Sequence, residues 1–221
     1  MLHGSGENET KGKKLHMKTD VIEISPTGEG MAEALRQTEK AAAYRELAFN
    51  ESLWLRLLAE ETTGMLRTIV GGERANFWAE SEGKSFTLHL TTVVQVNADM
   101  RQELLKTSTS GKNAAVRGFM SRVRDIFTQI TEPGGNSISP TDYGFSYVDV
   151  TSFDDASLGV TTHGMMYGWS MNAYKSAIAG RREEEAEKWD ELEKSITARL
   201  ADEIKILIRG NTVELVIEKA F

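Results

Sequence analysis

The stretch NESLWLRLLAEETTGMLRTIVGG, residues 50–72, decides the expected fold. Its apolar side chains recur at helical spacing, at Trp54, Leu57, Leu58, Met65 and Ile69. Asn50 is the expected N-cap, because its side-chain oxygen can accept a hydrogen bond from a free amide of the first turn. Gly71 and Gly72 are expected to end the helix. We therefore predict one amphipathic helix whose apolar stripe packs against a sheet.

Glu61 lies within this apolar stripe, between Leu57 and Met65. A carboxylate on an apolar face is costly unless it is hydrogen-bonded or paired. Two interpretations are open. Glu61 is either a residue at the edge of the stripe that reaches water, or a carboxylate at the floor of a ligand pocket.

The overall composition is that of an ordinary globular protein. The chain has 221 residues, of which 40% are hydrophobic and 27% are charged. A net charge of -7 argues against a nucleic-acid surface, which is usually basic. The chain has no cysteine and no apolar run of membrane-spanning length. We expect a cytoplasmic protein without nucleic-acid or membrane partners.

The domain organisation follows from changes in composition along the chain. Residues 1–20 are polar and rich in glycine and lysine, so we expect a flexible tail there. Residues 21–221 are expected to form a single domain. A turn-rich stretch with Pro133 and Pro140 opens a less regular region at about 131–180, which we interpret as an insertion.

Hydrophobic periodicity predicts an α+β fold. Strands are expected at residues 21–25, 76–80, 86–96 and 145–150, helices at 31–49, 114–130 and 181–201, and a closing hairpin at 204–208 and 212–217. Paired strands with interspersed helices suggest a two-layer α/β sandwich, with a mixed sheet covered by helices on one face. His89 falls on the polar face of its strand and is interpreted as a surface or hydrogen-bonded histidine.

A polar loop precedes the helix expected at 114–130. Ser110, Gly111 and Lys112 lie in it, and glycine and hydroxyl groups at a helix N-terminus can bind an anion. The Walker pattern fails, because its first glycine would fall at Lys106. A methionine and aromatic cluster between Met165 and Tyr174 is typical of a core or of a contact surface.

These features resemble the GHKL superfamily, which includes gyrase, heat-shock chaperone, histidine-kinase and mismatch-repair ATPases, and most closely its anti-sigma-factor kinases. LLAEETTGML is similar to the family helix in which a glutamate is followed four residues later by a magnesium-binding asparagine. Glu61 takes the glutamate position and Met65 the asparagine position. The resemblance covers residues 30–130 and 195–218, and it implies a Bergerat-like fold.

The chain departs from the family at the motifs that carry nucleotide chemistry. Asn97-Ala98-Asp99-Met100 stands where the family has Asp-x-Gly-x-Gly, and the expected ATP lid has only Gly111 and Gly118. Magnesium prefers hard oxygen ligands, which a methionine thioether does not supply. We therefore expect no metal, no cofactor and no ATPase or kinase activity.

Three functional hypotheses follow from this resemblance. The first is a non-catalytic regulatory or protein-binding module with a protein partner or self-association. The second is an active ATP- and magnesium-binding protein or anti-sigma-factor-like serine kinase, in which Glu61 would be catalytic. The third is a small-molecule or anion sensor. The candidate vestigial pocket consists of Glu61, Met65, Ser110, Gly111, Lys112 and Thr212.

Overall fold

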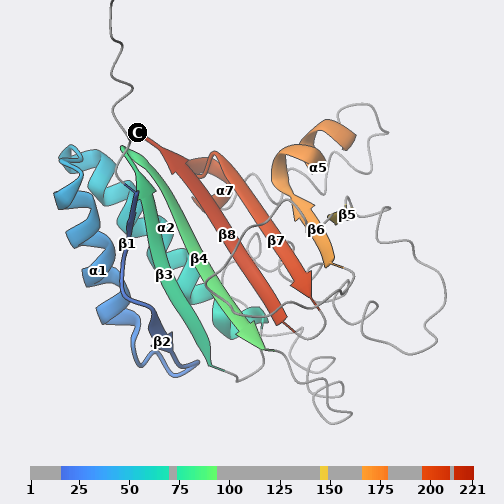
Figure 1. The fold of residues 1–221 in the computed structure, drawn as a ribbon, viewed down its shortest axis with the longest axis horizontal. Helices are drawn as coiled ribbons and strands as arrows, with labels where there is room; N and C mark the ends of the chain where they lie inside the picture. Colours follow the sequence, from blue (N-terminus) through green and yellow to red (C-terminus); the bar gives the residue numbers. More distant parts are fainter. Residues whose placement is uncertain (1–15, 70–73, 94–144, 149–165, 179–195, 210–211) are drawn as a thin grey trace, which may run out of the picture.

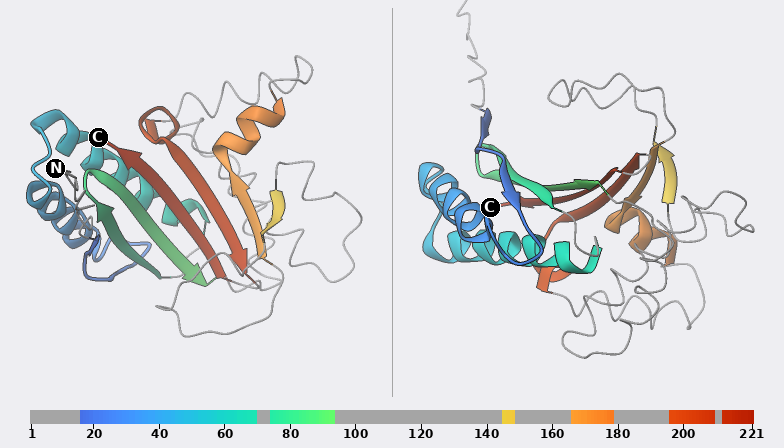
Figure 2. Two further views of the ribbon diagram at one scale, coloured as in Figure 1. Left: turned by 45° about the horizontal axis from the view of Figure 1, so that its top comes forward. Right: turned by 90° about the horizontal axis from the view of Figure 1, so that it is seen from below.

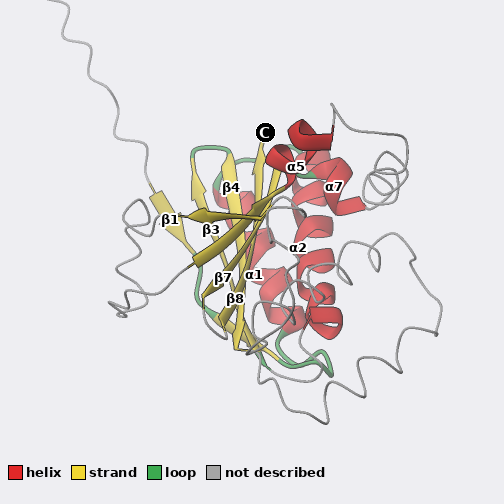
Figure 3. Cartoon of the chain, turned by 90° about the vertical axis from the view of Figure 1, so that its right-hand side faces the viewer, coloured by secondary structure: helices red, strands yellow, loops and turns green. Residues whose placement is uncertain are grey.

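The computed structural model describes residues 16–69, 74–93, 145–148, 166–178, 196–209 and 212–221. These residues form two layers, a curved antiparallel sheet and a set of helices over one of its faces (Figures 1 and 3). The expected α/β layering with helices on one face is therefore confirmed. The sheet itself differs from the expected mixed sheet, because all the recorded pairings between described strands are antiparallel.

The described part of the chain contributes eight strands to this sheet. They are β1 (His16–Lys18), β2 (Ile22–Ile24), β3 (Ala75–Glu82), β4 (Ser85–Val93), β5 (Phe145–Val148), β6 (Met166–Ser170), β7 (Glu203–Arg209) and β8 (Thr212–Ala220). Their order across the sheet is β1-β3-β4-β8-β7-β6-β5, and β2 also pairs with β3. Two local hairpins, β3-β4 and β7-β8, thus meet at the centre of the sheet.

The β3-β4 hairpin shows why the sheet has one apolar face. Gly83 allows a tight turn because its φ of 61° lies in the left-handed region. The strands then alternate, so that Phe77, Leu88 and Leu90 are buried under the helices. The same face continues into β8 and β7 through Leu215 and Ile206, which pair directly across the two strands.

The predicted closing hairpin is confirmed. β7 and β8 pair antiparallel over the expected region, and β8 also pairs with β4 along the whole length of β4. Leu90 lies opposite Leu215, and Leu88 lies opposite Ile217, so these pairs build the middle of the core. Cross-strand apolar pairs of this kind stabilise the sheet and set its register.

The edge strand β1 lies within the segment that was expected to be a flexible tail, residues 1–20. β1 pairs with β3 through His16, Met17 and Lys18. Thr19 then bonds to Ala79 twice, through its amide at 2.9 Å and its hydroxyl at 3.0 Å. Residues 16–19 of the expected tail therefore belong to the sheet edge, where Met17 packs against the core, while residues 1–15 lie outside the described residues.

Helix α1 (Met31–Tyr44) lies close to its neighbours because its buried residues are small. They are Ala34, Thr38, Ala41 and Ala42. Gly30 precedes the helix with a φ of 83°, and a Cβ there would lie 2.1 Å from the carbonyl oxygen of Glu23. Only glycine fits this position, which fixes the entry of α1 against β2.

Helix α2 (Phe49–Ile69) is the predicted amphipathic helix, but it begins earlier and is rotated. Ala48 accepts the first helical bond from Ser52, and the Glu51 carboxylate accepts the Ala48 amide at 2.7 Å. Asn50 is thus inside the helix rather than its N-cap. Glu51 provides the half of a capping box that protects the free amide. The predicted end at Gly71 and Gly72 lies outside the described residues.

The region interpreted as an insertion extends the same sheet. β5 and β6 lie within it, and β6 pairs with β7. Helix α5 (Met171–Ile178) follows β6, and Trp169 and Met171 are buried in the common core. The methionine and aromatic cluster therefore contributes to the core at these two positions. The short helix α7 (Ile196–Leu200) packs on α2, while residues 181–195 of the helix expected at 181–201 lie outside the described residues.

Candidate functional site

Glu61 lies on α2 at the edge of the core. Its side chain is half-buried, and no ion pair to it is recorded within the described residues. Burial raises the pKa of the Glu61 carboxyl above its ordinary value, and the neighbouring Glu60 carboxylate raises it further. The Glu61 side chain is thus neither fully buried nor fully exposed to water.

Met65 lies one turn after Glu61 and is a core residue. Its side chain is 3% exposed and belongs to the cluster that joins α2 to the sheet. A thioether packed among apolar neighbours gains dispersion contacts. Met65 is thus a packing residue of the core.

The other candidate pocket residues do not join Glu61 and Met65. Thr212 lies in the first position of β8, next to the core residue Val213, so alternation directs it to the face of the sheet away from the helices. Ser110, Gly111 and Lys112 lie outside the described residues. The described structure therefore brings Glu61 and Met65 together and places Thr212 on the opposite face.

A second apolar surface runs along the outer side of α2. It consists of Phe49, Leu53, Trp54 and the half-buried Leu57, and we call it the α2 ridge. The sequence-based stripe placed Trp54 toward the sheet, and the structure corrects this. The residues of the described α2 that face the core are Leu55, Leu58, Ala59, Thr62, Thr63 and Met65. Periodicity missed the rotation because α2 has apolar residues on both sides.

The helix-free face of the sheet carries an aromatic and ionic cluster. Trp78 of β3 and His89 of β4 lie directly opposite one another, and their rings stack with centroids 4.6 Å apart. His89 Nδ1 is 2.9 Å from Glu214 Oε1, on the neighbouring strand β8. Trp78 is only 5% exposed, although it lies on the face without helices.

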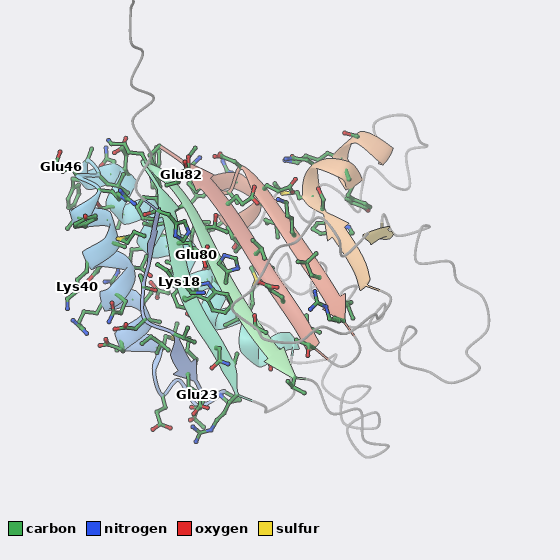
Figure 4. All side chains as sticks on the ribbon, viewed as in Figure 1. Lys18, Glu23, Lys40, Glu46, Glu80 and Glu82 are labelled. Carbon is green, nitrogen blue, oxygen red and sulfur yellow. The ribbon has the colours of Figure 1, made fainter. Side chains whose placement is uncertain are left out.

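Glu80 connects this cluster to the sheet edge. The indole N–H of Trp78 donates to Glu80 at 2.9 Å, and Lys18 Nζ lies 3.2 Å from the same carboxylate (Figure 4). Burial alone would raise the pKa of Glu80. The hydrogen bond from Trp78, the charge of His89 and the bonds from Lys18 and His16 outweigh burial, so the pKa lies below its ordinary value.

This arrangement holds the His89 imidazole in one orientation. A carboxylate at Nδ1 fixes the orientation of the ring and leaves Nε2 as its other polar atom. Within the part of the chain that the structure describes, neither the buried Nε2 nor the buried Thr91 hydroxyl, two residues further along the same face, has a hydrogen-bond partner. The sequence placed His89 on a polar face, but it gave no signal for Glu214, which lies 125 positions further along the chain.

No protein-family model matches this chain, and a search of curated proteins finds no match. Among the helices of the described residues, none is long and apolar enough to cross a membrane. Within the same residues, no three acidic or histidine side chains lie together in a way that could hold a metal ion.

Proposed function

We propose that this chain is a non-catalytic regulatory or protein-binding module built on a degenerate GHKL ATPase-like fold. The observation that carries the proposal is the burial of Met65. Its side chain stands at the position that resembles the family's magnesium-binding asparagine, and it is 3% exposed within the core. Magnesium requires oxygen ligands in octahedral array. Phosphate charge beside the Glu61 carboxylate would be repelled rather than bridged.

The Bergerat-like part of the proposal is supported by the arrangement of the helices and strands. A helix carrying Glu61 packs across the sheet, and a closing hairpin supplies the central strand β8 (Figure 2). Both features accord with the resemblance. The antiparallel pairing among the described strands departs from the mixed sheet that the resemblance implies.

The binding part of the proposal is supported by exposed apolar surface. Phe49 is 83% exposed and begins a ridge of apolar residues on the outer side of α2. Contiguous exposed apolar surface marks interaction sites more often than single exposed residues do. We also propose that the protein is cytoplasmic. Its partner would be another protein or a second copy of this chain, and not a nucleic acid.

A nucleotide titration tests the proposal. Purified protein is mixed with ATP, with and without magnesium, and the melting temperature is followed. A ligand that binds only the native state must raise stability. We expect no magnesium-dependent shift, and no phosphate release above that of a Glu61→Ala control.

Each alternative hypothesis predicts a different result. A magnesium-dependent shift that Glu61→Gln abolishes would contradict the proposal and favour an ATP-binding protein or kinase. A shift with inorganic phosphate alone, independent of magnesium, would favour an anion sensor.

A further inference from the structure

The α2 ridge is unusual for a helix that already buries another face. Phe49, Trp54 and Leu53 are 83%, 43% and 42% exposed, although α2 packs its other side on the sheet. Phe49, Leu53 and Leu57 follow one another at a spacing of four, so they form a continuous row along the helix. Such a row presents the pattern by which one helix docks against another.

Gly64 continues the same side of α2 and forms a notch. It is exposed, and a Cβ built on it would meet nothing within 4 Å. Glycine inside a helix costs about 1 kcal/mol relative to alanine, and no neighbour within the described fold requires it here. A missing side chain at an open helix surface allows another chain to approach closely.

The ridge and the notch are complementary to each other. Phe49 and Gly64 are separated by about 22 Å along the helix, at 1.5 Å per residue. If a second copy packs antiparallel, with the two-fold axis near Arg56 and Leu57, Phe49 of each copy faces Gly64 of the other. The most exposed aromatic ring then lies over the open notch.

The charges beside the ridge fit the same register. Arg56 is partly exposed and pairs with Glu39, while Glu60 is exposed. In the antiparallel register, Glu60 of one copy lies level with Leu53 of the other and about 4.5 Å along the helix from its Arg56. Each Arg56 can therefore pair with a carboxylate of the second copy, and the two-fold axis forms this pair twice.

We propose that the α2 ridge docks against the α2 ridge of a second copy of this chain. Phe49, Trp54 and Leu53 expose roughly 350 Å² per copy, taking about 200 Å² for a full side chain. With Leu57 and the stems of Arg56 and Glu60, the pair buries on the order of 1,000 Å², at the lower end of specific interfaces. The dimer is therefore weak and reversible.

Sedimentation of the full chain over a range of concentrations tests this inference. Wild type is expected to pass from monomer to dimer. Phe49→Glu should raise the dissociation constant about tenfold or more, because a charge replaces the aromatic ring that faces Gly64 of the other copy. Folding is preserved, since a carboxylate in the first helical turn is favourable. Val93→Glu, at an exposed apolar residue on the helix-free face, is the matched control and should leave the dissociation constant unchanged.

Gly64→Leu separates docking from folding. Leucine is a better helix former than glycine, and the site is open, so the monomer should melt at the same or a higher temperature. The side chain fills the notch, so association should weaken. A more stable protein that dimerises less well is an outcome that a purely structural role of Gly64 cannot produce.

A charge exchange tests the register. Arg56→Glu places like charges beside Glu60 of the second copy, and Glu60→Arg does the same with the opposite sign. Each variant alone should associate more weakly than wild type. An equimolar mixture restores both pairs, so the mixed dimer should approach wild-type affinity.

Two results would overturn the inference. A wild type that stays monomeric at all soluble concentrations has no such dimer, and binding to anionic vesicles through Phe49 would then assign the ridge to a membrane surface. A dimer that is unaffected by Phe49→Glu and Gly64→Leu uses another surface. The inference deepens the proposed binding function by naming one partner, and nucleotide titration tests that function separately.

Discussion

The two faces of the sheet are built from the same strands by opposite means. Adjacent residues of β3 show this, because Phe77 is buried under the helices while Trp78 stacks on His89 on the face without helices. The first face is held by apolar packing. The second is held by a chain of hydrogen bonds and ion pairs from Lys18 through Glu80, together with the His89–Glu214 pair. We therefore expect substitutions on the helix-covered face to cost more stability than substitutions on the other face.

Phe77→Ala should have the largest effect. Removing a fully buried phenylalanine leaves a cavity, so the free energy of unfolding should fall by about 3–5 kcal/mol. The matched change on the other face is Trp78→Phe, which keeps an aromatic ring and removes the N–H that binds Glu80. It should cost about 1 kcal/mol. Urea denaturation of both variants measures the contrast, and equal losses would contradict it.

The His89–Glu214 pair should show a smaller energy of interaction. A double-mutant cycle with His89→Ala and Glu214→Ala isolates it, because the two side chains contact each other at 2.9 Å. We expect an interaction energy of about 1–2 kcal/mol near neutral pH. A cycle that closes to zero would show that the carboxylate does not hold the imidazole.

Glu80 predicts a pH dependence of stability on the helix-free face. Its folded pKa lies below the ordinary 4.5, so the contribution of its carboxylate is present above 4.5 and is lost as pH falls through the folded pKa. Glu80→Gln should therefore be less stable than wild type at pH 7, by less than about 1 kcal/mol after solvent screening. The two proteins should converge in acid, and thermal melts at a series of pH values test this. A difference that persists below the folded pKa would contradict the assignment.

Glu61 should show the smallest effect, with the opposite sign. Its folded pKa is raised, so the charged carboxylate is penalised above that pKa and the penalty disappears below the unfolded pKa. Glu61→Gln should be neutral or more stable at pH 7, by a few tenths of a kcal/mol. The same melts, run beside those of Glu80→Gln, measure it. A clear loss of stability at pH 7 would show that the charged form has a partner.

Local patterns in the sequence predicted the closing hairpin and the two long helices of the described residues. Alternation located β4, β7 and β8, and helical spacing located α1 and α2. Periodicity alone did not give the rotation of α2, because Leu53 and Trp54 are as apolar as the buried Leu55. Hydrophobicity selects a helix, but it does not select between two apolar sides.

Long-range pairing explains the remaining differences. His89 and Glu214 meet only because β4 pairs with β8, and no local feature of either segment specifies that partner. The sequence did not predict β1 for a similar reason. Its own composition is polar, and its pairing with β3 stabilises it. Thr212 does not join the other candidate pocket residues, because a shift of one position along a strand moves a side chain to the other face of the sheet.

The pairing of β4 with β8 also has a consequence for how the chain folds. Each central hairpin closes a short turn, so β3-β4 and β7-β8 can form early and independently. Pairing β4 with β8 brings together residues that are far apart in the sequence, such as His89 and Glu214, which are 125 positions apart. Closing this long loop costs chain entropy before the core contacts form. Substitutions at the β4–β8 boundary, such as Leu90→Ala, are therefore expected to slow folding more than substitutions within either turn.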